Sequence, residues 1–324
     1  MGEHGRAVVA AGPVVWLCPG QGAQKVGMGK DLAERFPAAR ATFQAVDDAL
    51  GVALSRLMFS GPEEELTATH NAQPAILAHS AAVFTVVRKA VRTSPPAAAA
   101  GHSLGEYSAY VTAGALTAPA AARLVRRRGE LMHQAGAARP GTMAVVLGLA
   151  TAEVEAACRE ASRDGRVAVA ANLNAPDQTV ISGDPEAVVR AGEACKARGA
   201  KRVLPLKVSG AFHSPLMAPA AAPLSAALES APWREPEFPV VANATAEPVR
   251  TAVAARELLA AQLTAPVRWV ACMQRAAELA GPGARFLEIG PGTVLAALLK
   301  RIVPGANVVS LGSADEVTRF LEAA

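Results

Sequence analysis

Cysteine is scarce in this chain, and the four that are present lie far apart, at Cys18, Cys158, Cys195 and Cys272. None of them belongs to a Cys-x-x-Cys pair, so the sequence indicates neither a zinc site nor a disulfide framework. The pattern favours four buried thiols that act as small hydrophobic side chains. We therefore expect no metal site.

Aromatic residues and long apolar runs are scarce as well. Aromatic residues occupy 4% of the 324 positions, while 51% are hydrophobic, because alanine supplies much of that fraction. This composition predicts a helix-rich core built from small side chains. No apolar window is long enough to span a bilayer, and residues 1–6 lack the basic region and apolar core of a signal peptide. We expect a cytoplasmic protein that does not associate with membranes.

Charge is modest, with 19% charged residues and a formal net charge of +4. No run of lysine and arginine is interleaved with aromatic residues, so we expect no nucleic-acid partner. A mild basic patch could still face an acidic protein partner. The candidates are Lys201, Arg202, Lys207, Arg275, Lys300 and Arg301. Ordinary solvated surface charge is the simpler explanation for any one of them.

The sequence does contain a Gly-x-Ser-x-Gly motif, at residues 101–105. Small apolar residues at positions 97–100 precede it and a helix-compatible segment follows, as in a nucleophile elbow between a strand and a helix. The two glycines let the backbone bend sharply, and the first N–H groups of the helix can bind a developing oxyanion. The motif makes Ser103 the candidate nucleophile.

The order of expected elements indicates two parts. Residues 14–18 read as a buried strand and residues 28–50 as a helical stretch. A second unit follows as strand 143–148, helix 151–162 with Thr151 as its cap, strands 167–172 and 178–183, helix 184–198 and strand 201–206. This βαββαβ order is the ferredoxin-like split unit. We predict an α/β protein in which residues 1–138 and 208–324 form a large α/β-hydrolase-like domain with a mostly parallel sheet, and residues 139–207 form an inserted ferredoxin-like subdomain.

A serine nucleophile needs a base, and His213 is the best-placed of the six histidines, in a loop between a strand and a helix. His102 adjoins Ser103, so on an elbow the two side chains should point apart. No carboxylate is convincing as a third member, because Asp177 and Asp184 lie in loops of the small unit. A backbone carbonyl or an amide could orient the imidazole instead, which would make the site a Ser-His dyad.

One arginine stands out in the helix predicted over residues 118–134. Arg128 falls on the inward stripe with Leu124 and Leu131, whereas Arg126 points elsewhere. A guanidinium directed inward needs a partner. It could pair with a structural carboxylate or extend to solvent, or it could clamp a substrate carboxylate with its planar donors. The residues alone leave both interpretations open.

Several motifs occur together in a fixed order along the chain. They are Pro19-Gly20-Gln21-Gly22-Ala23-Gln24, Gln73-Pro74-Ala75, Gly101-His102-Ser103-Leu104-Gly105-Glu106, Arg128-Gly129, Ser209-Gly210-Ala211-Phe212-His213-Ser214-Pro215, Gln262 before Pro266-Val267-Arg268-Trp269, and Glu288-Ile289-Gly290-Pro291-Gly292. In this order and spacing the chain resembles the malonyl-CoA:acyl carrier protein transacylases and the acyltransferase domains of polyketide synthases. The resemblance extends from about Val14 to the end of the chain.

The resemblance implies transfer of a malonyl group from coenzyme A to the phosphopantetheine thiol of an acyl carrier protein. Ser103 would become acylated and His213 would be the base. The backbone amides of Gln21 and Leu104 would form the oxyanion hole. The backbone carbonyl of Gln262 would orient the histidine, which would account for the missing acid. No cofactor is implied, because coenzyme A enters as a thioester substrate, and we expect a monomer.

The resemblance also implies residues that bind the acyl group. Arg128 would grip the malonyl carboxylate, and Phe212 would crowd an α-methyl branch, although Gly210 replaces the histidine often found two positions before that phenylalanine. Asn172 would line the cleft, and His102 would contact the substrate.

Other functions remain open at this point. The pathway could be fatty-acid or polyketide synthesis, and the extender could be a larger one such as methylmalonyl. The same fold could also belong to a hydrolase that removes stalled acyl chains from acyl carrier proteins, or to a carrier-protein docking module without enzymatic activity. The buried cation argues against an editor of neutral acyl chains, and the intact Ser-His set argues against an inactive module.

Overall fold

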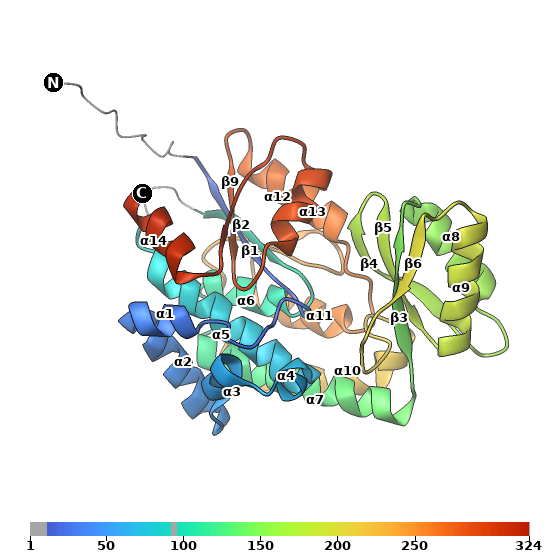
Figure 1. Ribbon diagram of the computed structural model, residues 1–324, viewed down its shortest axis with the longest axis horizontal. Helices are drawn as coiled ribbons and strands as arrows, with labels where there is room; N and C mark the ends of the chain where they lie inside the picture. Colours follow the sequence, from blue (N-terminus) through green and yellow to red (C-terminus); the bar gives the residue numbers. More distant parts are fainter. Residues whose placement is uncertain (1–11, 92–95, 324) are drawn as a thin grey trace.

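The computed structural model describes residues 12–91 and 96–323, so the segment 1–6, for which no signal peptide is expected, lies outside the described residues. Figure 1 shows a larger part with helices on both sides of its sheet and a smaller part beside it that carries the strands β3 (Thr142–Leu147), β4 (Ala168–Ala175), β5 (Gln178–Gly183) and β6 (Arg202–Pro205). Among the described helices, none is both long enough and apolar enough to cross a membrane.

The larger sheet is parallel except at one edge. Within the described residues it has six strands, in the spatial order β10 (Asn307–Leu311), β9 (Arg285–Ile289), β1 (Val14–Cys18), β2 (Pro96–Gly101), β7 (Val240–Val241) and β8 (Pro248–Val249). Only β8 runs antiparallel to its neighbour. The carboxyl ends of β1, β2 and β7 therefore meet at one edge, where the loops of an open α/β sheet form binding sites.

Side chains of β1 alternate between two hydrophobic cores. Val14 and Trp16 belong to one core, and Val15 and Leu17 to the core on the opposite face. The first core is covered by α1 (Lys30–Arg35), α2 (Pro37–Leu50), α3 (Leu54–Ser60), α4 (Glu63–Thr67), α5 (Thr69–Val87), α6 (Gly105–Thr112), α7 (Ala118–Ala138), α10 (Ala218–Ser230), α11 (Ala252–Gln262) and α14 (Ala314–Ala323). The second is covered by α12 (Trp269–Ala280) and α13 (Val294–Ile302). Burial on both faces explains why the strand is apolar throughout.

The smaller sheet is antiparallel, with its strands in the order β4-β5-β3-β6. The helices α8 (Thr151–Ala161) and α9 (Pro185–Ala197) cover one face, on which Val146 and Ile181 are buried. The opposite face contributes Met143 and Val180 to the core of the larger part. The predicted fold class is confirmed: a mostly parallel sheet is combined with a ferredoxin-like unit. The predicted domain boundaries at 138/139 and 207/208 stay a prediction.

Some local predictions are wrong. The helical stretch 28–50 is two helices, because Phe36 precedes a proline and adopts an extended backbone, with φ −117° and ψ 110°, between α1 and α2. Thr151 does not cap α8. Ala150 occupies the cap position, and the Thr151 hydroxyl lies 3.2 Å from that of Thr179 on β5. The helix expected over residues 118–134 continues to Ala138.

Candidate active site

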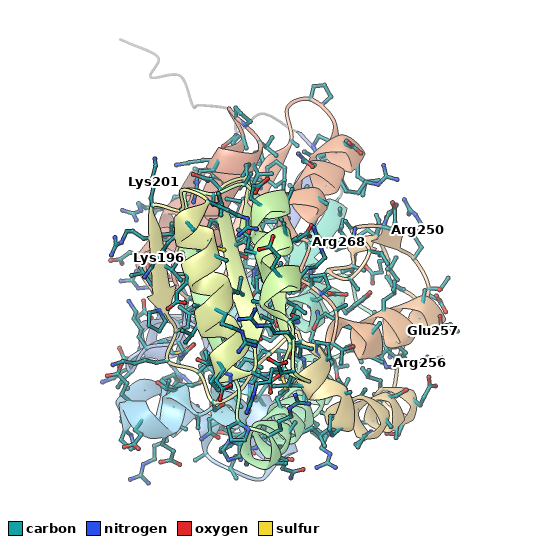
Figure 2. All side chains as sticks on the ribbon, turned by 90° about the vertical axis from the view of Figure 1, so that its right-hand side faces the viewer. Lys196, Lys201, Arg250, Arg256, Glu257 and Arg268 are labelled. Atoms are coloured by element: carbon teal, nitrogen blue, oxygen red, sulfur yellow. The ribbon has the colours of Figure 1, made fainter. Side chains whose placement is uncertain are left out.

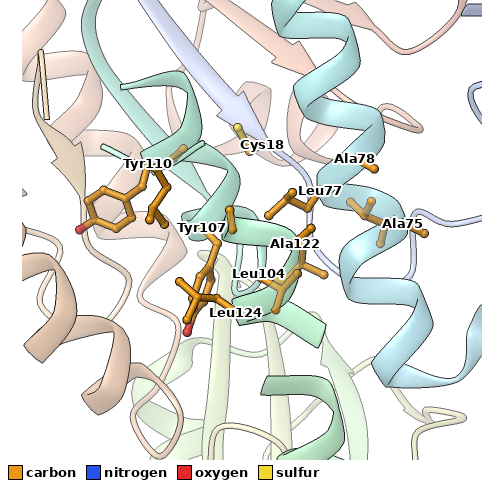
Figure 3. Packing of buried hydrophobic residues seen from close by; sticks show 14 of the residues in the cluster. Cys18, Ala75, Leu77, Ala78, Leu104, Tyr107, Tyr110, Ala122 and Leu124 are labelled. Atoms are coloured by element: carbon orange, nitrogen blue, oxygen red, sulfur yellow. The ribbon is translucent and has the colours of Figure 1, made fainter. Parts of the chain in front are cut away.

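The Gly-x-Ser-x-Gly segment forms a tight turn between β2 and α6, as predicted. Ser103 has φ +53°, a conformation that non-glycine residues adopt rarely and mostly where the surrounding structure enforces it. The flanking glycines are required, because a Cβ atom on Gly101 would lie 1.9 Å from the carbonyl oxygen of Gly105. Figure 3 shows Leu104 and Tyr107 of this segment packed in the buried cluster beside α5.

His213 lies directly against the elbow. Its Nε2 is 2.7 Å from Ser103 Oγ, and its Nδ1 is 3.0 Å from the backbone carbonyl oxygen of Gln262. That carbonyl can only accept, so Nδ1 carries the proton and Nε2 is free to accept one from the serine. Burial, and then the charge of Arg128, lower the pKa of His213 to about 3. The imidazole is therefore neutral near pH 7 and able to act as a base.

Neither loop acid that the sequence offers is part of this pair. Asp184 accepts hydrogen bonds from Arg139, and Asp177 is paired with Arg301. The orienting group is the carbonyl of Gln262, at the last residue of α11.

Arg128 of α7 is buried, with 1% of its surface exposed. Its guanidinium donates to Gln73 Oε1 at 2.8 Å, to Gln262 Oε1 at 3.0 Å and to Ser103 Oγ at 3.1 Å. Within residues 12–91 and 96–323, no carboxylate oxygen lies within 4 Å of it. The side chain therefore neither extends to solvent nor forms a direct ion pair, and it places a buried positive charge beside the serine. Burial lowers its pKa.

A chain of polar side chains connects Arg128 with the loop after β1. Gln73 Nε2 donates to the Thr69 hydroxyl at 3.0 Å, and that hydroxyl donates to Gln21 Oε1 at 2.9 Å. Because Gln73 also accepts from Arg128, the guanidinium and the Gln21 loop are held in one arrangement.

A cavity of about 870 Å³ opens over Ser103 between the two parts of the molecule. The larger part contributes seven of the predicted residues, namely Gln21, His102, Ser103, Leu104, Arg128, Phe212 and His213, and the smaller sheet contributes Asn172. The cavity therefore brings together every predicted site residue except Gln262, which lies behind His213. Leu104 is at the N-terminal end of α6, where the first amides of a helix have no partner within the helix.

The ring of His102 is turned away from the serine hydroxyl. Its Nε2 lies 2.8 Å from Asn174 Oδ1, and its ring packs at 5.3 Å from that of Trp269. The first contact joins the elbow to β4 of the smaller sheet, and the second joins it to α12.

The sequence reasoning missed Asn243. Its Oδ1 accepts a hydrogen bond from the Ser103 amide at 2.7 Å, and its Nδ2 donates to the Gly101 carbonyl at 2.8 Å. One signal could have found it: Asn243 closely follows β7, a parallel neighbour of β2, so both segments leave the sheet at the same edge. Among the described residues, no group of three or more His, Cys, Asp or Glu side chains could hold a metal ion.

A serine on a strand-turn-helix elbow, with a neutral histidine as its base and a helix N-terminus beside it, defines an enzyme of acyl chemistry on an α/β fold. Residues 15–319 match the family described as acyl transferase domain, and the chain belongs to that family.

Relatives are similar over nearly the whole chain. The malonyl CoA-acyl carrier protein transacylase of Bacillus subtilis is 43% identical over 304 residues, covering 94% of this chain and 95% of the relative. The Escherichia coli protein of the same name is 43% identical over 308 residues, covering 95% and 98%.

Two solved structures are also similar to this chain. One is a chain from the structure of a complex, described as type II PKS acyl-carrier protein in complex with its malonyl-transacylase. It has a TM-score of 0.90 and 42% identity, and the match covers 96% of this chain and 100% of that chain. The malonyl-CoA:acyl carrier protein transacylase of Xanthomonas oryzae has TM-score 0.91 and 41% identity, with coverage of 96% and 98%.

Proposed function

We propose that this enzyme transfers a malonyl group from coenzyme A to the phosphopantetheine thiol of an acyl carrier protein. One observation carries the substrate assignment: the buried guanidinium of Arg128 lies 3.1 Å from Ser103 Oγ and has no carboxylate partner among the described residues. In a malonyl ester of Ser103, the free carboxylate is two bonds from the ester carbonyl carbon. A short acyl group with a terminal carboxylate therefore places that carboxylate beside Arg128.

The proposed reaction has two matching halves. Ser103 Oγ attacks the thioester carbonyl carbon while His213 Nε2 takes its proton, and the amides of Gln21 and Leu104 bind the oxyanion. The carbon–sulfur bond breaks, and the proton passes from His213 to the departing thiolate of coenzyme A. The carrier-protein thiol then gives its proton to His213 and attacks the ester carbonyl carbon. The bond from that carbon to Ser103 Oγ breaks, and Oγ takes the proton back from His213. In this proposal the protein's own side chains and backbone amides carry out every step, and coenzyme A takes part as a substrate and not as a cofactor. The order of steps predicts ping-pong kinetics.

The other cavity residues are proposed to select the acyl group. The Phe212 ring crowds the space that an α-methyl branch would occupy, and Asn172 and His102 line the path of the thioester arm. A panel of malonyl-, methylmalonyl- and acetyl-CoA tests this selection, because equal acylation by malonyl and methylmalonyl would refute the role of Phe212.

Carrier-protein docking is the less specific part of the proposal. Of the basic rim candidates, Lys207 lines the cavity, whereas Arg275 and Arg301 are engaged in ion pairs. Lys201 projects from the edge of the smaller part in Figure 2, exposed and available to an acidic partner. A monomer and a cytoplasmic location stay part of the proposal.

Covalent labelling tests the nucleophile. Incubation with radiolabelled malonyl-CoA should leave label on the protein after denaturation, and Ser103→Ala should abolish it. Ser209→Ala, which alters another serine that lines the cavity, should keep the label. Full labelling of Ser103→Ala would refute the assignment.

Product analysis separates transfer from hydrolysis. With carrier protein present, the label should move to the carrier faster than free malonate forms. An excess of free acid would favour the editing hydrolase.

A further inference from the structure

A buried carboxyl group lies under the elbow and has no part in the chemistry described so far. Glu106, in the first turn of α6, has no exposed surface. Its Oε2 accepts hydrogen bonds from Gln262 Nε2 at 2.7 Å and from the backbone amide of Asn243 at 3.0 Å. Both donors belong to residues that hold Ser103, so one oxygen atom organises the support of the nucleophile.

The first branch of this network reaches the serine backbone from two sides. Asn243 Oδ1 accepts from the Ser103 amide at 2.7 Å, and Gln262 Nε2 donates to the Ser103 carbonyl at 3.0 Å. Ser103 has φ +53°, so its backbone conformation must be stabilised by its surroundings. Glu106 contacts both groups that provide this stabilisation.

The second branch reaches Arg128. The side-chain amide of Gln262 has a definite orientation, because Nε2 faces Glu106 and Oε1 accepts from Arg128 at 3.0 Å. In the reversed orientation two donors would face each other at the guanidinium, and two oxygens would face each other at Glu106. An acceptor at position 106 therefore acts together with Arg128 and the Ser103 carbonyl to fix which end of Gln262 faces the arginine.

We propose that Glu106 is a positioning residue for the acyl transfer: its Oε2 sets Asn243 and Gln262, and through them the serine backbone and the guanidinium that receives the substrate carboxylate. The inference rests on the proposed function, since it assigns Arg128 to substrate binding. The role belongs to an acceptor oxygen at the right distance, not to the charge.

The ionisation of Glu106 is consistent with this role. Burial raises its pKa to about 7, against hydrogen bonds from Asn243 and Gln262 that lower it. Its Oε1 has no hydrogen-bond partner within the described residues. A proton on Oε1 leaves Oε2 able to accept from both donors, so the network is the same in the neutral and charged forms.

Two conservative variants separate distance from charge. Glu106→Gln keeps the side-chain length and an acceptor oxygen but removes the charge, and its acylation rate and malonyl-over-acetyl preference should stay within a few-fold of wild type. Glu106→Asp keeps the charge but withdraws the oxygens by one methylene. Its single-turnover acylation rate with malonyl-CoA should fall about 100-fold, as expected for displaced reacting groups. Its malonyl preference should fall too, because Gln262 loses the shortest of the contacts that orient its side-chain amide.

Glu288 provides a matched control. It is also a fully buried glutamate, but its oxygens accept from the amides of Leu295 and Ala296 at the start of α13 and from Ser310. Glu288→Asp and Glu106→Asp should both lower the melting temperature, but Glu288→Asp should leave the acylation rate of the folded enzyme unchanged.

The decisive measurement is rapid-quench acylation by malonyl-CoA and acetyl-CoA, with the melting temperature of each variant. Wild-type rate and selectivity in Glu106→Asp would overturn the proposal, as would an equally large loss in Glu106→Gln. If Glu106→Asp does not fold, Asn243→Ala carries the test. It should slow acylation with malonyl preference retained, and an unchanged rate would overturn the proposal. Wild-type enzyme that forms no malonyl-enzyme would refute the proposed function instead.

Discussion

Replacing Arg128 by glutamine separates recognition of the acyl carboxylate from the chemistry at the serine. Removing one member of a buried ion pair costs about 3–5 kcal/mol, which corresponds to a loss of about 150- to 5,000-fold in kcat/KM for malonyl-CoA. Acetyl-CoA has no carboxylate to pair with the guanidinium. Its reaction loses only the hydrogen bond from Arg128 to Ser103 Oγ, at 3.1 Å, or about tenfold. The malonyl-to-acetyl ratio should therefore fall by about 15- to 500-fold.

The assay is a competition in which both labelled thioesters acylate the enzyme together, so the amount of active protein cancels. Arg126→Gln is the control, because Arg126 lies on the same helix but donates to the backbone carbonyl of His70 at 3.1 Å and contacts Asn71. Its malonyl-to-acetyl ratio should equal that of the wild type. An unchanged ratio in Arg128→Gln would refute the carboxylate clamp, whatever happens to the absolute rate.

Two further predictions concern the base and the turn. Because the pKa of His213 lies at about 3, the imidazole stays neutral from pH 8 to pH 5, and the acylation rate at saturating malonyl-CoA should not fall with a pKa near 6.5. With a histidine of ordinary pKa, the acylation rate would fall about 30-fold at pH 5. Quenched acylation assays at a series of pH values measure the difference. Gly101→Ala should destabilise the protein by about 3 kcal/mol or more in denaturant titration, since its Cβ would lie 1.9 Å from the Gly105 oxygen. Gly192→Ala on α9, whose Cβ comes no closer than 3.1 Å to Val203, should be neutral or stabilising, and a loss as large as that of Gly101→Ala would contradict the steric argument.

Short-range patterns carry much of the information about this fold and site. The apolar run ending at Cys18 and the small residues before Gly101 are short enough that only strands fit, and their order with the helices predicts the parallel sheet. The helical spacing of Arg128 with leucines predicts that its side chain is buried. Whether Arg128 forms a direct ion pair could be decided only from the structure, because each described element packed around the guanidinium must be checked for a carboxylate oxygen within 4 Å.

The functional residues that the sequence analysis did not identify act through contacts that form only in the folded chain. Asn243 is 140 positions from Ser103, and nothing in its local sequence distinguishes it from a turn asparagine. Gln73 is visible only as part of a motif, and its hydrogen bond to Arg128 requires that α5 pack against α7. The break at Phe36 could have been predicted, since the residue before a proline disfavours the helical conformation.

The two reacting residues share a strain that the sequence does not reveal. Ser103 and His213 both have positive φ angles, of 53° and 55°. Each such conformation costs about 1–3 kcal/mol and persists only where the surrounding structure enforces it. The groups that hold them, Asn243 and Gln262, lie in one segment after β7, which carries no reacting atom. In the sequence, the smaller sheet separates this segment from the part of the larger domain that contains Ser103, so the segment can hold Ser103 only after those two parts of the chain have packed together. The catalytic geometry therefore depends on the packing of the segment that contains Asn243 and Gln262. Substitutions in this segment should lower activity before they lower the content of secondary structure.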